Sequence, residues 1–351
     1  MVTGAHLSET FGRTVEEIEK DGFQIAERVE SLLGSDTPRG RAKSIGVQIT
    51  GLVQAFSRLE PDLLLAPCDR EEAISTALAG TYLNLPVAHL YGGDKTESGI
   101  VDDQVRHAVT KLAHVHLVMT QEHAERVLRL GEELWRVHVV GHGGLDRLPR
   151  EPELDRRQLS ERLGIDLSEG PIGIVIQHAM SNDIERAAEH MQTTLDAVAD
   201  SDLRGVIIYP NSDAGGQASI RAILQFTEGQ DDWRAFPNLP RREFVNLLLH
   251  ADVLVGNSTC GIQEAPSLGL PVVNVGPRQI GRLHGDNVLF VSHKRRKIVD
   301  AIHRALTDAE FLRLVVEKRN PFGDGRTGGR VAGILASLEL GPRLLHKDIT
   351  F

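Results

Sequence analysis

The chain has 351 residues, 41% of them hydrophobic and 25% charged, with a formal net charge of −10. This length suits two domains with separate cores, and the composition excludes a disordered chain. The sequence has no basic stripe or arm for nucleic acid, no apolar run near the ~20 residues that span a membrane, and only two cysteines. We therefore expect a cytoplasmic protein with no disulfide framework and with neither nucleic acid nor a membrane as partner.

Short apolar runs alternate with amphipathic stretches along the whole chain. The runs, read as strands, cover 62–67, 85–91, 115–120, 137–141, 172–178, 205–210, 252–256, 271–276 and 288–292. The intervening patterns predict helices, for example over 15–33, 71–83, 102–114 and 182–199. Continuous apolar runs are typical of parallel strands covered on both faces, and their alternation with helices predicts doubly wound α/β sheets.

The stretch 143–155 is rich in Pro, Gly and charged residues and is interpreted as a linker between domains. We place one α/β domain over residues 1–148 and a second from residue 149 onward. In open α/β sheets ligands bind beyond the carboxyl ends of the strands. The polar residues that follow the predicted strands are therefore the candidates for a site.

In the second domain the strongest signal is VLVGNSTCGIQEAPSLG at 253–269. A strand leads into a small polar loop, and a helix is predicted to begin near Gly261. Backbone N–H groups with the hydroxyls of Ser258 and Thr259 would cradle an anion, and Glu264 would accept hydrogen bonds from a ribose diol. Plain helix capping is the alternative interpretation of the same residues.

Other polar residues follow the neighbouring strands of this domain. Arg278 and Arg282 come after the next strand, with structural salt bridging as the alternative. His178 closes the first strand, where a hydrogen-bonded core histidine is the alternative. Asn211 and Asp213 follow the second strand and are equally explained by capping.

In the first domain a plausible acid–base cluster lies at strand ends and at a helix start. Asp69 follows a strand, although Asp69–Glu72 also fits a capping box. Tyr91 ends the next strand, and Asp102 with Arg106 opens a predicted helix. Spacing alone leaves open which of these side chains converge.

Together these motifs resemble the hydrolysing UDP-N-acetylglucosamine 2-epimerases of the sialic acid synthesis type, over nearly the whole chain and in the same order. The matching strings are VTGAHLSETFGRTVEEIEKDGF at 2–23, DREE at 69–72, VDDQVRHAVTKLAH at 101–114, IQH at 176–178, IYPNSDAGG at 208–216, VGNSTCGIQEAP at 255–266, VGPRQIGRLHGDNV at 275–288 and NPFGDG at 320–325.

The resemblance implies two Rossmann-like doubly wound domains that face each other across a cleft, the GT-B-like arrangement. A C-terminal helix at about 328–351 would rejoin the first domain, leaving 149–327 as the UDP-binding domain. The implied catalytic residues are Asp69, Asp102, His178, Tyr91, His6 and Arg106. The implied UDP-binding residues are Ser258, Thr259, Gly261, Glu264, Arg278, Asn257, Asn211 and Asp213.

The implied reaction starts from UDP-N-acetylglucosamine or a related UDP-2-acetamido sugar. UDP leaves with the C2 proton to give a glycal, and water then adds to release the free 2-epimer, such as N-acetylmannosamine. Neither a metal nor a redox cofactor is required, and a homodimer or homotetramer is expected. A UDP-sugar-binding protein without catalysis and a GT-B glycosyltransferase are the alternatives.

Departures from the family concern the reacting end of the site. The family opens with a strand and a Gly/Arg loop before the VTG-x-H string, whereas this chain opens at the string, so exposed strand edges and a groove are expected in the first domain. Tyr91 stands where many relatives carry Glu or His, and a phenol would act there only with its pKa lowered from ~10. Cys68 replaces a common Gly and Ala179 a common Pro.

Overall fold

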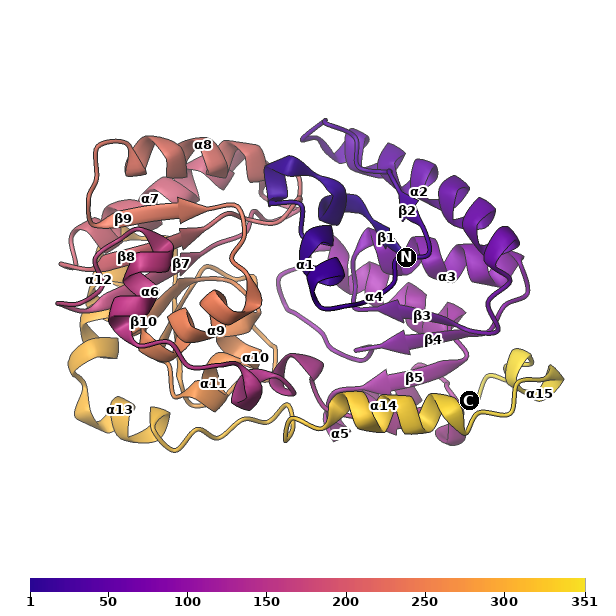
Figure 1. Cartoon of the computed structure of the whole chain (residues 1–351). Coiled ribbons are helices and arrows are strands. Elements are labelled where there is room, and N and C mark those ends of the chain that lie inside the picture. Colours follow the sequence, from indigo (N-terminus) through magenta and orange to yellow (C-terminus); the bar gives the residue numbers. More distant parts are fainter. Residues whose placement is uncertain (351) are drawn as a thin grey trace.

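The computed structural model describes residues 1–350 and shows two α/β domains side by side (Figure 1). The first domain carries a four-stranded sheet in the order β3-β4-β5-β6 and a separate pair, β1-β2; the second carries a six-stranded sheet in the order β12-β11-β10-β7-β8-β9. All paired strands are parallel. The expected pair of α/β, Rossmann-like domains is confirmed, and the second sheet has the reversal of strand order that defines a doubly wound sheet.

The nine predicted strands all appear, and three further strands were not predicted. The strands are β1 (Val2–Thr3), β2 (Arg28–Val29), β3 (Leu64–Pro67), β4 (Val87–Leu90), β5 (Val115–Val118), β6 (Val137–Val139), β7 (Ile172–Ile176), β8 (Arg204–Ile208), β9 (Trp233–Phe236), β10 (Val253–Gly256), β11 (Val272–Val275) and β12 (Val288–Val291). Within residues 1–350, strand β9 pairs only with β8, and its sequence WRAF places a charge in the run, so the apolar pattern is broken.

The helices cover both faces of the sheets. They are α1 (Val15–Lys20), α2 (Pro38–Leu59), α3 (Glu71–Tyr82), α4 (Val101–Leu112), α5 (Gln121–Arg129), α6 (Arg156–Leu163), α7 (Ala187–Ala199), α8 (Gly216–Thr227), α9 (Arg241–His250), α10 (Cys260–Gln263), α11 (Ala265–Leu268), α12 (Arg295–Thr307), α13 (Ala309–Val315), α14 (Thr327–Ala336) and α15 (Pro342–Leu345). Within residues 1–350, none is both long and apolar enough to cross a bilayer.

The helix expected over 15–33 is wrong beyond its first turns. Helix α1 ends at Lys20, and Gly22 follows with a left-handed φ of 84°, which glycine adopts without steric cost. The chain then forms β2 and begins the 22-residue α2, which was not predicted. Thr37 caps α2 by accepting the Gly40 N–H at 3.0 Å, and Pro38 occupies its first turn, so a recognisable start signal was present.

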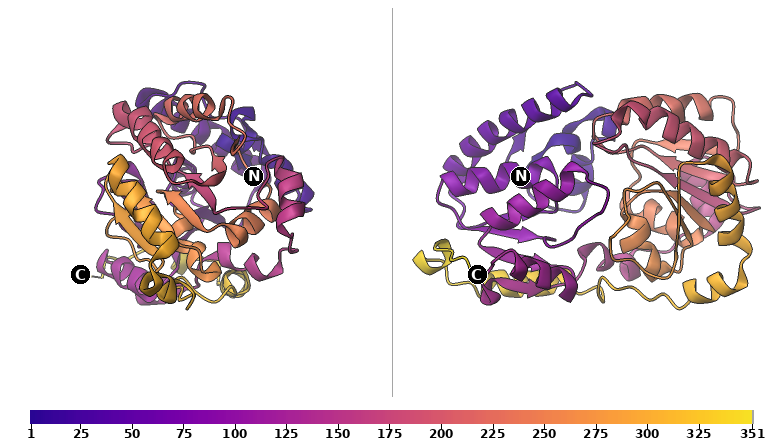
Figure 2. Two further views of the ribbon diagram at one scale, coloured as in Figure 1. Left: turned by 90° about the vertical axis from the view of Figure 1, so that its left-hand side faces the viewer. Right: turned by 180° about the vertical axis from the view of Figure 1, so that it is seen from behind.

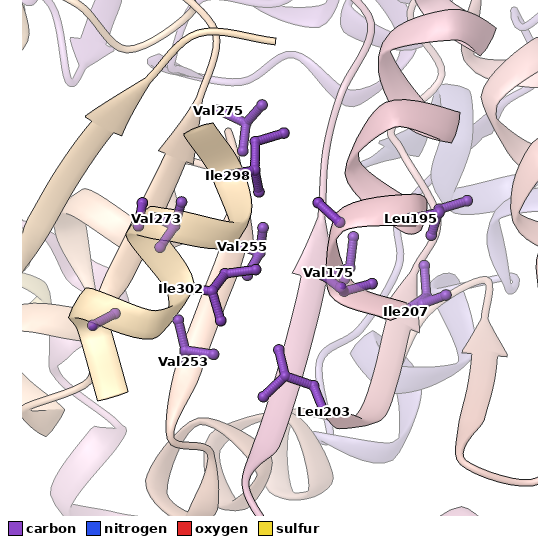
Figure 3. Close-up of a cluster of buried hydrophobic side chains, with 14 of the residues drawn as sticks. Val175, Leu195, Leu203, Ile207, Val253, Val255, Val273, Val275, Ile298 and Ile302 are labelled. Carbon is purple, nitrogen blue, oxygen red and sulfur yellow. The ribbon is translucent and has the colours of Figure 1, made fainter. Parts of the chain in front are cut away.

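Burial on both sheet faces explains the continuous apolar runs. In the second domain Val175, Val253, Val255, Val273 and Val275 point to one face, where α7 and α12 cover them (Figure 3). Leu195 and Ile302 of these helices complete that core. A second cluster fills the opposite face. This packing holds the carboxyl ends of β7, β10 and β11 together, and those ends carry candidate site residues.

The C-terminal part of the chain returns to the first domain, as Figures 1 and 2 show from opposite sides. Ile334 and Leu335 of α14 pack on the β5 side of the first sheet. Arg136 donates a hydrogen bond to the Leu344 carbonyl at 2.8 Å. The helix expected over 328–351 is thus two helices, α14 and α15. The boundary at residue 148 stays a prediction.

Strands β1 and β3 have unpaired edges, because β1 bonds only to β2 and β3 only to β4 within the described residues. Both β2 and β3 contribute to one core, through Val29 and Leu64, beneath α2 and α3. The β3 face opposite that core leaves Leu65 41% exposed. The first domain therefore consists of two short sheets rather than one continuous sheet.

Candidate functional site

A cavity of about 770 Å³ lies between the domains, at the carboxyl ends of both sheets. All six predicted catalytic residues line it: His6, Asp69, Tyr91, Asp102, Arg106 and His178. Four of the eight predicted UDP-binding residues line it: Asn211, Ser258, Thr259 and Arg278. The other four, Asn257, Gly261, Glu264 and Asp213, are not among the described residues that line it, so their contact with a nucleotide stays a prediction.

Two strand ends reach the cavity through strained backbone. Cys68 after β3 and Tyr91 after β4 have left-handed φ values of 62° and 73°. Side chains with a Cβ rarely adopt this region, at a cost of roughly 1–3 kcal/mol, and such residues cluster at functional sites. The buried His89 supports one turn, because its Nε2 lies 2.8 Å from the Cys68 carbonyl oxygen. Strain here turns the chain so that Asp69 faces the cavity.

Asp69 is held by an arginine rather than by a helix. The N-cap of α3 is Arg70, not Asp69, and no side chain among residues 1–350 makes a capping hydrogen bond there. The capping-box alternative is therefore wrong. Instead Arg106, with a 2% exposed side chain, donates to the Asp69 carboxylate and to Asp103. Burial opposes ionisation, but the charges of Arg106 and Arg282 outweigh it and hold the pKa of Asp69 below its usual range. Asp69 is therefore an ionised carboxylate.

The surroundings of Asp102 shift its pKa in the direction opposite to that of Asp69. Burial, the Asp69 charge and the Asp213 charge raise the pKa of Asp102 to about 6, although Arg278 lies 3.6 Å from its carboxylate. Two carboxylates in one cavity thus have pKa values displaced in opposite directions. This separation is characteristic of an acid–base residue beside a permanently charged one.

The raised pKa of Asp102 has a consequence for stability. Because the native pKa, about 6, exceeds the unfolded value near 3.9, ionisation destabilises the native protein as pH rises from about 4 to 6. We compare the free energies of unfolding of Asp102→Asn and the wild type. We expect the difference between them to shift by about 2 kcal/mol in favour of Asp102→Asn when the pH is raised from 4.5 to 8. Urea unfolding at both pH values measures this, with Asp300→Asn on the exposed face of α12 as control. An unchanged difference between the two pH values would contradict the assignment.

His178 is fixed in one tautomer. The backbone N–H of Asn211 donates to His178 Nδ1 at 3.1 Å. Since a backbone N–H only donates, Nδ1 carries a lone pair, and the neutral ring has its proton on Nε2. Burial and the Arg278 charge lower the pKa of His178 to about 3. His178 is therefore a neutral hydrogen-bond donor on the cavity wall.

Tyr91 lacks the lowered pKa that an acid–base role requires, because burial raises the pKa of its phenol. Its hydroxyl accepts the Gly143 N–H at 2.8 Å, and its ring lies 5.2 Å from that of His142. Tyr91 thus tethers the chain after β6 to the cavity wall. His6 lies at the open side of the cavity with its Nδ1 2.7 Å from Thr14 Oγ1.

The loop after β10 is shaped by Gly256, whose φ of 134° and 2.1 Å approach of a built Cβ to the Ile176 carbonyl exclude any side chain. Asn257 then spans β10 and β7, accepting the His178 N–H at 2.7 Å and donating to the His178 carbonyl at 3.0 Å. This pair of hydrogen bonds gives the Asn257 amide a structural role. It presents Ser258 and Thr259 to the cavity.

The helix predicted near Gly261 is two short helices, α10 and α11, and Gly261 packs against Val272. Glu264, between them, pairs with Arg241 at 2.8 Å. Arg241 also donates to the Gly144 carbonyl at 2.8 Å and lines the cavity. Arg241 was missed because its partners are distant in sequence.

The loop after β8 is held by the first domain. Arg70 contacts Asp213 at 3.0 Å, and Asp36 accepts the N–H groups of Gly215 and Gln217 at 2.9 and 3.1 Å. These cross-domain contacts place Asn211 against His178. Neither Arg70 nor Asp36 was predicted, because their partners follow more than a hundred residues later.

No group of three or more His, Cys, Asp or Glu side chains that could hold a metal ion occurs among residues 1–350. The predicted absence of a metal and of a cofactor stays a prediction.

Two Rossmann-like domains and a shared cleft that presents carboxylates opposite a hydroxyl-bearing loop define a GT-B-like protein. The structure is similar to that of UDP-GlcNAc 2-epimerase from Neisseria meningitidis bound to UDP-GlcNAc, with a TM-score of 0.80, 16% identity and coverage of 96% of this chain and 91% of that chain.

Sequence comparison identifies the family. The UDP-N-acetylglucosamine 2-epimerase family model matches residues 1–336, and this chain belongs to that family. It is 35% identical to a hydrolysing UDP-N,N'-diacetylbacillosamine 2-epimerase of Legionella pneumophila, over 99% of this chain and 89% of the relative. It is 30% identical to a UDP-N-acetylglucosamine 2-epimerase of Neisseria meningitidis, over 89% of this chain and 80% of the relative. The expected family membership is confirmed.

Proposed function

We propose that the protein is a hydrolysing 2-epimerase of UDP-N-acetylglucosamine or a related UDP-2-acetamido sugar. One observation carries the proposal: a single cavity holds Asp69 and Asp102, with pKa values displaced in opposite directions, opposite Arg278 and the Ser258–Thr259 loop. The names of the related enzymes agree with this chemistry.

The first half-reaction breaks the bond between C1 and the diphosphate oxygen. The bond pair leaves with UDP, and Arg278 and the Nε2–H of His178 stabilise the developing negative charge. The ionised Asp69 stabilises the oxocarbenium-like sugar. Asp102, with its pKa near the working pH, takes the C2 proton, and a C1–C2 double bond forms.

The second half-reaction adds water to the glycal. The water oxygen bonds to C1 and the water loses a proton, while C2 receives a proton from solvent on the face opposite to the one that Asp102 deprotonated. Asp102 releases the first proton to solvent, and the product is the free 2-epimer. Contact between the domains excludes bulk water until the glycal has formed. We propose a homodimer or homotetramer in the cytoplasm as the working form.

Incubation in D2O tests the function. We expect UDP-N-acetylglucosamine or UDP-N,N'-diacetylbacillosamine to yield UDP and a free 2-epimer carrying one deuterium at C2. UDP alone should raise the melting temperature, because it binds only the native state. Saturable UDP binding without turnover of either sugar would contradict the enzymatic proposal, as would consumption that requires a sugar acceptor.

A further inference from the structure

A buried ion pair between Asp94 and Arg282 joins the two domains. Arg282 Nε donates to Asp94 Oδ2 at 2.9 Å, and its Nη2 donates to the same oxygen. The side chains are 3% and 8% exposed, and both residues line the cavity. Asp94 follows β4 in the first domain and Arg282 follows β11 in the second, so the pair exists only while the domains are in contact.

Arg282 reaches the predicted nucleotide side of the cavity. Its Nη1 donates to Thr259 Oγ1 at 3.3 Å and to Gln279 Oε1 at 2.9 Å. Gln279 in turn donates to the Asn257 carbonyl at 2.7 Å. The guanidinium is therefore oriented by the loop that presents Ser258 and Thr259.

Asp94 reaches the predicted catalytic side. Its backbone carbonyl accepts a hydrogen bond from Arg106 Nη1 at 3.2 Å, and the same guanidinium holds Asp69. Its second carboxylate oxygen accepts the Lys95 N–H at 2.8 Å. A continuous set of hydrogen bonds thus runs from Thr259 through Arg282, Asp94 and Arg106 to Asp69.

We propose that Asp94 and Arg282 are positioning residues that couple closure of the second domain to the placement of Arg106 and Asp69. This inference rests on the proposed function of the cavity. A buried ion pair contributes little net stability, because desolvation of both charges offsets their attraction. The pair instead fixes the positions of the neighbouring side chains. It also brings the positive charge of Arg282 close to the Asp69 and Asp102 carboxylates when the domains close.

The field around those carboxylates is set by groups from both domains. The charged groups facing them are Arg106, Arg282, Arg278, Arg70 and Asp213. Because Asp69 and Asp102 titrate as an interacting pair, loss of the Arg282 charge makes the pair harder to ionise. The acid limb of kcat/KM then moves to higher pH, an effect that a merely structural ion pair would not produce.

Arg282→Met and Asp94→Asn test the coupling. We expect each to lower kcat by about 10–100-fold and to raise the Kd for UDP by about 3–10-fold, because UDP then binds without the affinity that domain closure contributes. Their effects should be far from additive in the double variant. Arg282→Lys, which keeps the charge, should restore the wild-type acid limb and part of kcat. Glu133→Gln, which removes the partner of the buried Arg136 outside the cavity lining, should leave kcat and the acid limb unchanged.

Small-angle X-ray scattering separates this inference from the proposed function. UDP should reduce the radius of gyration of the wild type but not that of Arg282→Met. If neither UDP-sugar is turned over and this difference is still found, the proposed function fails while the coupling stands. If Arg282→Met closes on UDP and keeps the wild-type kcat and acid limb, the inference is overturned.

Discussion

Asp69→Asn is expected to lower kcat by about 10³-fold while the Kd for UDP stays within about threefold of wild type. The substitution keeps the shape of the side chain but removes the ionised carboxylate that Arg106 holds in the cavity. An amide cannot stabilise an oxocarbenium-like centre, whereas the nucleotide contacts come from the other domain. Initial rates with the UDP-sugar and calorimetric titration with UDP measure the two quantities.

Asp103→Asn is the matched comparison for this result. Asp103 pairs with the same Arg106 but does not line the cavity. Its replacement should cost less than about tenfold in kcat. If Asp69→Asn weakens UDP binding as much as it lowers kcat, the assignment of catalysis to the first domain and of UDP binding to the second is wrong.

Arg278→Met is expected to weaken UDP binding by about 10–100-fold, corresponding to roughly 1.5–3 kcal/mol for charge-assisted hydrogen bonds to a diphosphate. Its side chain is 9% exposed, lines the cavity, and donates to the Asn257 carbonyl at 3.2 Å. The guanidinium is therefore held in place before a ligand arrives. Calorimetric titration with UDP measures the change.

Two variants control this second result. Arg278→Lys keeps the charge but not the planar fork of donors, so its Kd should lie between wild type and Arg278→Met. Arg204→Met removes an arginine of the same domain that contacts Asp166 and Asp232 away from the cavity. It should bind UDP like the wild type. Wild-type affinity in Arg278→Met would place the diphosphate elsewhere.

The site was predictable where a residue acts at the end of its own strand. Asp69, Tyr91 and His178 follow apolar runs, and parallel strands bring such positions to one edge of each sheet. The site was not predictable where a side chain acts through a distant partner. Arg241 with Glu264 and Arg282 with Asp94 are examples, because no periodicity links their positions.

Local sequence also failed to separate alternatives that differ only in a hydrogen-bond partner. The Asp69–Glu72 spacing fits a capping box, yet the Asp69 carboxylate turns to Arg106 because the latter is buried and needs a counter-charge. The tautomer of His178 depends on the Asn211 N–H, and that loop is placed by Asp36 from the opposite domain.

The amino-acid sequence by itself determined the α/β class, nine of the strands and the family, because apolar periodicity and ordered motifs are properties of contiguous residues. Only the tertiary structure decided which carboxylate is ionised, which carries the raised pKa and which cations reach them across the cleft. The physical reason is that burial and Coulomb interaction depend on distances through space, and these arise only when the two domains meet.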